Sequence, residues 1–292
     1  MTAISVWIQA ARPKTLWAAV VPVLIGSTIA YADGLFHYLS AAAALAGALA
    51  IQIGTNFTND YSDFAKGADT KDRKGPTRVT QAGLLPPQAV KRAAALTFAI
   101  ASLVGVYLIA RGGWPVLAIG VSSILAGIFY TAGPKPLGYM GLGDFFVLVF
   151  FGPVAVAGTY YVQTLTVNWI VVTAGLAPGF LSVALLAINN LRDIDEDRIA
   201  RKRTLAVRFG RGFARSQYIG CIVAASLVPV FLVLATGERI WTLACLLILP
   251  VAAPEFRRLM QGTAGEALNP MLASTARLSI IFSLLFALTW IL

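Results

Sequence analysis

Residues 169–189 read WIVVTAGLAPGFLSVALLAIN, and the residues that follow, 190–197, read NLRDIDED. The first stretch carries no charged side chain and is as long as the roughly 20 mostly apolar residues with which a helix crosses a bilayer. The second stretch places four carboxylates directly after it. Acidic groups joined so closely to a membrane span are costly and usually functional. An apolar span followed directly by an acidic cluster therefore predicts a membrane protein whose functional site lies near one bilayer surface.

The same arrangement occurs earlier in the chain, where an apolar stretch over 40–58 is followed by a second acidic cluster. In both clusters an Asn precedes an Asp by four residues, as Asn59 and Asp63 and as Asn189 and Asp193. Residues four apart lie on one face of a helix. The shared spacing hints at an internal duplication.

The composition indicates lipid as the solvent, because 58% of the 292 residues are hydrophobic and only 12% are charged, against about 25% in soluble domains. Nine long apolar segments can be marked, and they lack the alternation of barrel strands. They lie at 16–32, 40–58, 93–110, 115–131, 144–162, 169–189, 216–236, 240–253 and 276–292. We therefore expect an all-α integral membrane protein, with about nine transmembrane helices in a single bundle that forms one domain over 1–292.

Basic residues indicate the orientation of the predicted bundle. All but three of the 23 Lys and Arg residues fall in the segments 1–15, 59–92, 132–143, 190–215 and 254–275. Short loops rich in Lys and Arg face the cytoplasm. This asymmetry predicts a cytoplasmic N-terminus in a multi-pass protein of the cell (inner) membrane, with both acidic clusters on the cytoplasmic side.

Several function classes are disfavoured by the sequence. The net charge of +10 comes from basic residues in short loops between apolar runs, which argues against nucleic-acid binding. His37 is the only histidine, and the two cysteines, Cys221 and Cys245, lie inside apolar stretches. A zinc site and a histidine-based catalytic triad are therefore excluded.

The two acidic clusters predict a magnesium and diphosphate site. Mg²⁺ prefers oxygen ligands and typically takes one or two carboxylates together with water and phosphate oxygens. Carboxylates alone would repel a diphosphate, so we expect Mg²⁺ to bridge them, aided by the negative carbonyl ends of both helices. Basic residues would neutralise the remaining phosphate charge. The candidates are Lys66, Arg73, Arg78, Lys135, Arg192, Lys202 and Arg203.

A third stretch, YTAGPKPLGY at 130–139, is predicted to form a turn at the same face, because Pro and Gly interrupt the helix. Tyrosines at a membrane surface often serve only as an aromatic belt. For Tyr139 this interpretation and a functional role both stay open, whereas for Tyr130, which opens the loop, a functional role is favoured.

Taken together, these motifs resemble the UbiA-type intramembrane aromatic prenyltransferase superfamily, and within it most resemble the 1,4-dihydroxy-2-naphthoate polyprenyltransferases of menaquinone synthesis. The resemblance is carried by Asn59-Asp60-Tyr61-x-Asp63 with Gly67-x-Asp69, by Asn190-Leu191-Arg192-Asp193 with Asp197, and by stretches at 11–16, 130–134, 141–144, 158–161 and 202–208. These residues span 11–210, which is most of the chain.

The resemblance implies an Mg²⁺-dependent enzyme that transfers a polyprenyl group from an allylic polyprenyl diphosphate to 1,4-dihydroxy-2-naphthoate. Carbon dioxide and diphosphate would be lost, giving demethylmenaquinol. The expected partners are these two substrates and the lipid bilayer, without nucleic acid or an obligate protein partner. The prenyl tail would run between helices towards lipid.

Roles for individual residues also follow from the resemblance. The implied metal ligands are Asn59, Asp60, Asp63, Asp69, Asn189, Asp193 and Asp197. The implied catalytic residues are Asp63, Asp193, Tyr130 and Lys135. Contacts to the acceptor are expected from Arg12, Tyr61 and Tyr160.

The chain departs from the superfamily pattern at two positions. Ubiquinone-type members follow Asn-x-x-x-Asp-x-x-x-Asp, but here Gly67 stands at the third position and the acid appears later, at Asp69. This longer form resembles the naphthoate branch and argues against 4-hydroxybenzoate as acceptor. Arg201 stands where that branch leads us to expect Gly.

Alternatives remain at this stage. The same prenyl transfer could use another aromatic acceptor, such as 4-hydroxybenzoate. A cation-coupled transporter would instead place ionisable residues near the bilayer midplane, in broken helices. A membrane scaffold without catalytic activity would give no reason for two matched acidic clusters.

Overall fold

The computed structural model describes residues 2–68 and 74–292, and the described chain is helical without a strand. The elements in chain order are α1 (Ala3–Ala11), α2 (Pro13–Ala32), α3 (Tyr38–Ala65), α4 (Pro87–Gly112), α5 (Trp114–Phe129), α6 (Gly143–Phe150), α7 (Pro153–Thr164), α8 (Trp169–Arg192), α9 (Ile194–Ile199), α10 (Leu205–Thr236), η1 (Ile240–Leu247), α11 (Ile248–Met260), η2 (Gly265–Leu268) and α12 (Asn269–Ile291).

The predicted membrane spans are confirmed as helices. Within the described residues, eight helical segments are long and apolar enough to cross a bilayer, and α5 is a shorter apolar helix of 16 residues. Three of the eight are composite, since α6 and α7 together form the span Gly143–Thr164, η1 continues into α11, and η2 continues into α12. The chain is therefore a multi-pass helical membrane protein.

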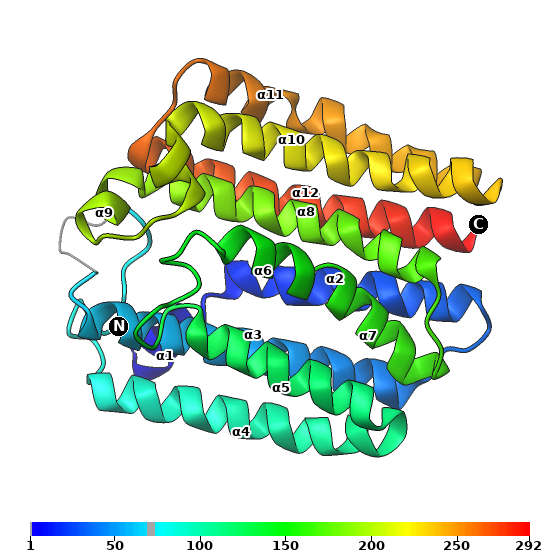
Figure 1. The fold of residues 1–292 in the computed structure, drawn as a ribbon, viewed down its shortest axis with the longest axis horizontal. Helices are drawn as coiled ribbons and strands as arrows, with labels where there is room; N and C mark the ends of the chain where they lie inside the picture. Colours follow the sequence, from blue (N-terminus) through cyan, green and yellow to red (C-terminus); the bar gives the residue numbers. More distant parts are fainter. Residues whose placement is uncertain (1, 69–73) are drawn as a thin grey trace.

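The helices run roughly parallel along the long axis of the molecule (Figure 1). The α8, α10, α11 and α12 helices lie on one side and α3, α4 and α5 on the other, with α2, α6 and α7 between them. The N-terminus and α9 lie at one end of the bundle and the C-terminus at the other. We call the end that holds α9 the α9 end.

The main core lies where α2, α8, α10 and α12 meet. Its largest fully buried apolar side chains include Ile25, Leu181, Ile222 and Phe282. By contrast, α4 has only five buried residues along its 26, so most of this helix faces outward. The tightly packed half thus provides a fixed wall, against which the more open α3–α5 half can enclose a cavity.

Glycines fix α6 and α7 against α8. The turn between α6 and α7 approaches α8 so closely that a Cβ atom on Gly175 would lie 2.7 Å from Cα of Pro153. A Cβ atom on Gly152 would lie 2.7 Å from the carbonyl oxygen of Gly175. Because side chains are excluded here, the backbones meet directly, as is common between membrane helices.

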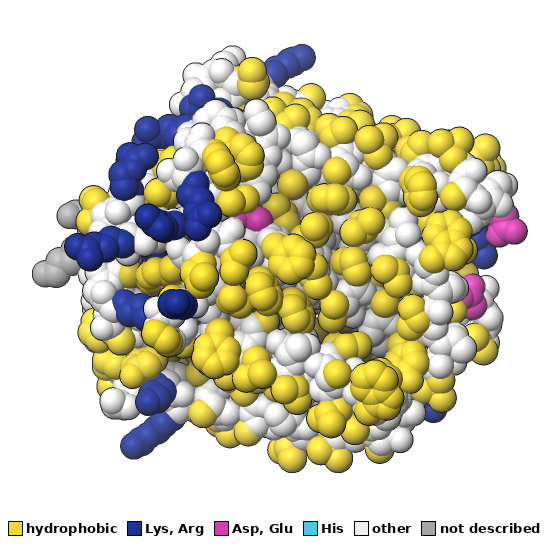
Figure 2. Space-filling view, viewed as in Figure 1, with side chains coloured by type: hydrophobic (Ala, Val, Ile, Leu, Met, Phe, Trp, Pro, Cys, Tyr) yellow, Lys and Arg dark blue, Asp and Glu magenta, His cyan; other side chains and the backbone are white. Residues whose placement is uncertain are grey.

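Charged side chains are unevenly distributed over the surface. Figure 2 shows Lys and Arg gathered around the α9 end, while hydrophobic side chains cover the middle of this face. A broad apolar belt is the surface expected of a protein surrounded by lipid. Which end faces the cytoplasm stays a prediction.

Candidate functional site

A cavity of about 840 Å³ lies inside the bundle, lined by residues of α2 to α9 and α12 and of the loops near them. Asp63, Asp193 and Asp197 line the α9 end of this cavity, so the structure brings the two acidic clusters together. Away from this end the walls are mostly small or apolar side chains of α3, α4, α5 and α7. The cavity thus joins a charged chamber to an apolar one.

The Asp63 carboxylate meets three donors of the described chain in the chamber. Its Oδ1 atom accepts a hydrogen bond from the Tyr139 hydroxyl at 2.7 Å. Its Oδ2 atom lies 3.1 Å from a guanidinium nitrogen of Arg78 and 3.4 Å from Nζ of Lys202. These three donors come from three different loops, which the buried carboxylate therefore holds together.

Lys202 connects the two clusters. Its Nζ atom lies 3.9 Å from Oδ1 of Asp197, besides its contact with Asp63. The same ammonium group lies 4.9 Å from the ring centre of Tyr139, as does that of Lys66. Both cations therefore contact the aromatic face of the tyrosine that orients Asp63.

Asp193 is held by its neighbour in sequence. The Nε and Nη2 atoms of Arg192 lie 2.6 Å and 2.7 Å from the two Asp193 oxygens. Arg192 is only 2% exposed, and its Nη1 atom donates to Asn269 at 3.0 Å. This two-pronged pairing fixes the direction of the Asp193 carboxylate.

Asn59 is oriented by the loop between α5 and α6. Its side-chain oxygen accepts a hydrogen bond from the Thr131 hydroxyl at 2.7 Å. Lys66 supports the same loop, because its Nζ atom donates to the carbonyl oxygens of Thr131 at 2.5 Å and Gly133 at 3.0 Å. Partial burial lowers the pKa of Lys66, although the charge of Asp63 acts in the opposite direction.

Asp60 points away from the chamber. Its two oxygens accept hydrogen bonds from the backbone N–H groups of Val79 at 3.2 Å and Thr80 at 3.0 Å. The side chain is buried and is absent from the cavity lining. Asp60 therefore fixes the loop that carries Arg78.

The helices that carry Asp63 and Asp197 end in the same way. At the end of α3, the N–H groups of Gly67 and Ala68 bond to the carbonyls of Phe64 and Asp63, and Gly67 has φ +66°. At the end of α9 the N–H groups of the residues at 201 and 202 bond to the carbonyls at 198 and 197, and Arg201 has φ +56°. Both ends are Schellman motifs, in which a left-handed residue closes the helix. Asp63 and Asp197 occupy equivalent positions four residues before it.

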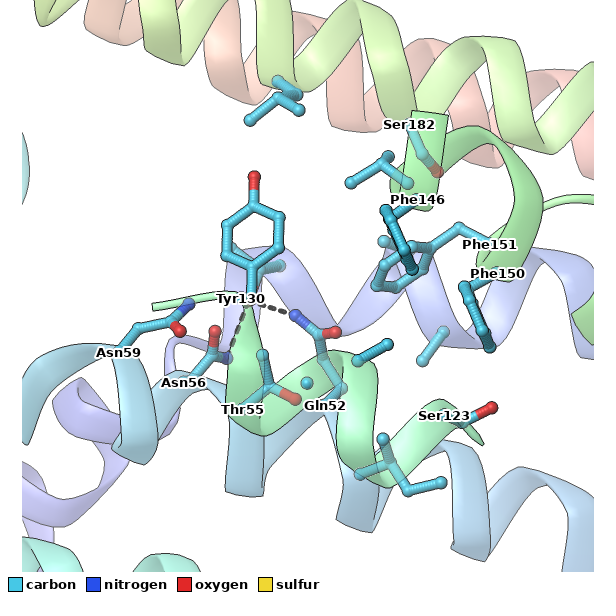
Figure 3. Close-up of a pocket in the computed structure, with 18 of the residues that line it drawn as sticks. Gln52, Thr55, Asn56, Asn59, Ser123, Tyr130, Phe146, Phe150, Phe151 and Ser182 are labelled. Atoms are coloured by element: carbon cyan, nitrogen blue, oxygen red, sulfur yellow. Dashed lines mark hydrogen bonds between the residues drawn. The ribbon is translucent and has the colours of Figure 1, made fainter. Parts of the chain in front are cut away.

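Tyr130 stands in the middle of the cavity (Figure 3). Its hydroxyl group points away from Asn56 and Asn59 on α3, and Phe146, Phe150 and Phe151 lie to one side of it. Burial raises the pKa of Tyr130 well above its ordinary value, and the charges of Asp144, Asp197 and Asp63 act in the same direction. Tyr130 therefore stays protonated and presents a hydroxyl group near the chamber.

Two of the predicted acceptor contacts lie away from the cavity. Arg12 lines it, at the junction of α1 and α2. Tyr61 packs beside the small core under α1, with Lys91 5.6 Å from its ring centre. Tyr160 donates its hydroxyl hydrogen to Asp33, at the opposite end of α2.

Several predicted cations also lie outside the cavity lining. Lys135 is exposed on the loop between α5 and α6, and Lys66 is engaged with loop carbonyls. Arg203 is exposed, and its backbone N–H donates to the carbonyl of Tyr139 at 2.8 Å. The predictions for Asp69 and Arg73 lie outside the described residues.

The sequence interpretation missed some residues that line the chamber. Asn189 lines it as expected, and Asn190 does so as well. Tyr139 lines it and contacts Asp63, although its sequence position fitted a membrane-belt residue equally well. The Asn–Leu–Arg–Asp run could have identified Asn190, whereas the contact of Tyr139 depends on the path of its loop.

The oxygen ligands in the chamber would suit a Mg²⁺ ion that also binds water and phosphate oxygens, rather than one held by protein side chains alone. Among residues 2–68 and 74–292, no group of three Asp, Glu, His or Cys side chains is close enough to hold a metal by itself. Mg²⁺ usually takes one or two carboxylates and completes its shell with water and phosphate oxygens. Asp63, Asp193 and Asp197, with the amides Asn59 and Asn189, can supply that partial set.

Comparisons with known proteins agree with the architecture. A family model described as the UbiA prenyltransferase family matches residues 19–281. The 1,4-dihydroxy-2-naphthoate octaprenyltransferase of Mycobacterium tuberculosis is 38% identical over 98% of this chain and 97% of its own length. The Escherichia coli protein of the same name is 39% identical, over 97% of this chain and 94% of its own length.

Solved structures share the fold at much lower identity. A UbiA homolog from Archaeoglobus fulgidus superimposes with a TM-score of 0.67 at 13% identity, covering 97% of this chain and 98% of that one. The same homolog bound to GPP and Mg²⁺ gives a TM-score of 0.66 at 15% identity, covering 97% and 99%. At these identities the likeness supports the fold alone.

Proposed function

Because the chain belongs to the UbiA prenyltransferase family, we propose that it transfers a polyprenyl group from an allylic polyprenyl diphosphate to 1,4-dihydroxy-2-naphthoate. Carbon dioxide and diphosphate are released, and demethylmenaquinol is formed for menaquinone synthesis. The chamber in which Asp63, Asp193 and Asp197 meet at the mouth of an apolar cavity carries this proposal. It is supported by relatives that bear this activity in their names at 36–39% identity over nearly the whole chain.

The charged chamber suits the diphosphate. When bound, Mg²⁺ would neutralise the diphosphate and lower the energy of its departure. The ligands of this Mg²⁺ would be Asp63 at the end of α3, Asp197 near the end of α9, and Asp193 at the end of α8. Arg78 and Lys202 line the same chamber and supply positive charge to the diphosphate oxygens. We therefore favour these two cations over Lys66, Lys135 and Arg203.

The apolar part of the cavity suits the prenyl chain. When the bond between C1 and the diphosphate oxygen breaks, the electron pair leaves with the diphosphate and C1 becomes an allylic cation. The surrounding apolar walls exclude water, which would otherwise capture this cation. The Tyr130 ring lies where it can face the cation. The ring carbon of the acceptor then attacks C1, and loss of the carboxylate as CO₂ returns an electron pair to the ring.

Arg12 is a suitable contact for the acceptor carboxylate, because it lines the cavity and carries a positive charge. We do not retain Tyr61 and Tyr160 as acceptor contacts, since their side chains are engaged elsewhere. We place the chamber at the cytoplasmic side of the cell membrane, because the basic side chains that favour that side gather around it (Figure 2).

The purified protein in lipid nanodiscs tests the proposal. It is incubated with a polyprenyl diphosphate, Mg²⁺ and either 1,4-dihydroxy-2-naphthoate or 4-hydroxybenzoate, and products are identified by mass. We expect a prenylated, decarboxylated naphthoate whose formation stops when EDTA removes the metal. Asp63→Ala and Asp193→Ala should abolish turnover, whereas Asp195→Ala, at a half-exposed position of α9 outside the cavity lining, should not. Absence of the naphthoate product, with prenylated 4-hydroxybenzoate formed, would contradict the acceptor assignment.

A further inference from the structure

A buried carboxylate in the first turn of α6 has no part in the diphosphate chamber described above. Asp144 is 8% exposed and lines the cavity. Its Oδ1 atom accepts a hydrogen bond at 2.7 Å from the side-chain amide of Gln217, on α10. Among the described residues, no Lys or Arg is paired with it. A buried carboxylate is costly unless its oxygens are hydrogen-bonded, so an acceptor oxygen facing the cavity calls for a donor.

Asp144 lies beside Tyr130. A Cβ atom added to Gly143 would lie 2.8 Å from the Tyr130 hydroxyl oxygen, so the first turn of α6 touches that hydroxyl group. Asp144 also exerts the largest charge effect on Tyr130, ahead of Asp197 and Asp63. Tyr130, Asp144 and the carboxylates of the diphosphate chamber therefore line one cavity, and a ligand held by Asp144 would share that cavity with the diphosphate.

The wall beyond Asp144 is apolar and largely aromatic. Phe146, Val147 and Phe150 follow it along α6 and line the cavity. The rings of Phe146 and Phe150 are nearly parallel, with an interplanar angle of 2° and centroids 6.0 Å apart (Figure 3). A polar group at one end of an aromatic wall is the arrangement expected for a flat ring that carries a hydrogen-bond donor.

We propose that Asp144 accepts a hydrogen bond from a ring hydroxyl group of the aromatic acceptor, that Gln217 positions Asp144, and that the acceptor ring packs beside Phe146. This inference rests on the proposed function, because it needs a hydroxylated aromatic acceptor in the cavity. The hydrogen bond fixes the orientation of the ring beside the allylic carbon. It also pushes electron density into the ring, which strengthens the ring carbon as a nucleophile.

A purely structural role for Asp144 makes different predictions. In that case the Gln217 contact only ties α6 to α10, and its loss lowers stability without changing which acceptor is preferred. Glu255 provides a matched control, since it is another buried carboxylate at 7% exposure, on α11, that does not line the cavity. The test therefore compares Asp144→Asn with Glu255→Gln.

The experiment measures acceptor binding without prenyl donor, by anaerobic calorimetric titration of the protein in nanodiscs. The ligands are 1,4-dihydroxy-2-naphthoate, 1-hydroxy-2-naphthoate and 4-hydroxy-2-naphthoate. A hydrogen bond to a charged group contributes about 1.5–3 kcal/mol, so the wild-type protein should bind the dihydroxy compound about 10- to 100-fold more tightly than one of the two analogues. Asp144→Asn should reduce that preference to about threefold or less, while Glu255→Gln should keep it.

The outcomes are distinct. An unchanged preference in a folded Asp144→Asn protein, or an equal loss in Glu255→Gln, would overturn the role of Asp144. Failure of the wild-type protein to turn over naphthoate, with its binding preference and the Asp144 effect intact, would contradict the proposed function and leave the subsite supported. A Gln217→Leu variant that weakens the same preference, without changing the KM for polyprenyl diphosphate, would support the positioning role of Gln217.

Discussion

Tyr139 donates its hydroxyl hydrogen to Oδ1 of Asp63 across 2.7 Å, joining a loop to a helix end 76 residues earlier in the chain. Groups that hydrogen-bond a ligating carboxylate orient it, and their loss typically costs 10- to 100-fold in metal affinity or activity. The contact makes Tyr139 a positioning residue for the proposed diphosphate chamber.

Tyr139→Phe should therefore raise the Mg²⁺ concentration needed for half-maximal turnover by about tenfold or more. The ring, and with it the contacts to Lys66 and Lys202, would be retained, so the change isolates the hydroxyl group. Tyr31→Phe, at an exposed position of α2, is the control. An unchanged Mg²⁺ requirement in Tyr139→Phe would remove this role.

Asp60→Asn tests whether Asp60 is a metal ligand or only supports the loop that carries Arg78. Asn has one acceptor oxygen, so one of the N–H groups of Val79 and Thr80 would lose its partner and the Arg78 loop would shift. We expect a higher KM for polyprenyl diphosphate and a loss of about 1–3 kcal/mol in stability, with the Mg²⁺ requirement unchanged. Steady-state kinetics at several Mg²⁺ concentrations check this. A large rise in the Mg²⁺ requirement would restore Asp60 as a ligand.

The spacing of residues on helices was readable from the sequence, and the contacts of loops were not. Asp63 and Asp193 follow apolar spans at helical spacing, so their meeting at one end of the bundle could be predicted. Asp60 and Asp63 are only three residues apart, yet they face a loop and the cavity respectively. That difference depends on where the Arg78 loop packs, which no periodicity encodes.

Gly67 shows how a departure from a motif can have a backbone cause. At the sequence level it occupied the place of an expected carboxylate. In the structure it has φ +66° and closes α3, a conformation in which glycine is favoured over residues with a side chain. The equivalent position after Asp197 is Arg201, so both departures fall on the left-handed residue that closes a helix.

Lys202 and Lys135 offer a matched pair for locating the diphosphate. Lys202 contacts Asp63 and Asp197 in the chamber, whereas Lys135 is exposed and outside the lining. Loss of a charge-assisted hydrogen bond of about 1.5–3 kcal/mol should lower kcat/KM about 10- to 100-fold in Lys202→Met. Lys135→Met should keep activity within about threefold of wild type. The reverse order of effects would return Lys135 to the catalytic site.

Lys66→Met tests support of the Thr131 loop. Two carbonyl groups would lose their donor, and because Gly133 is exposed to solvent we expect a loss of about 0.5–1.5 kcal/mol in unfolding free energy. Because burial lowers the pKa of Lys66, the unfolded chain binds more protons than the folded one between the folded pKa and 10.5. Unfolding free energy should therefore rise with pH in that window for the wild type. The part of this rise due to Lys66 should be absent from Lys66→Met, and identical pH profiles would contradict the assignment.

Arg201→Gly should stabilise the protein. Arg201 closes α9 at φ +56°, where a residue with a Cβ atom is strained by about 1–2 kcal/mol relative to glycine. Its side chain is exposed, so little packing is lost. We expect a gain of about 1 kcal/mol in unfolding free energy, measured by thermal unfolding, with turnover retained because Lys202 keeps its place after the turn. Arg198 lies within α9, one residue before its last, where glycine is less favourable than a residue with a side chain. Arg198→Gly should therefore lower the unfolding free energy by about 0.5–1 kcal/mol. If both glycine variants lose stability equally, the strain at position 201 is not what distinguishes it from Gly67.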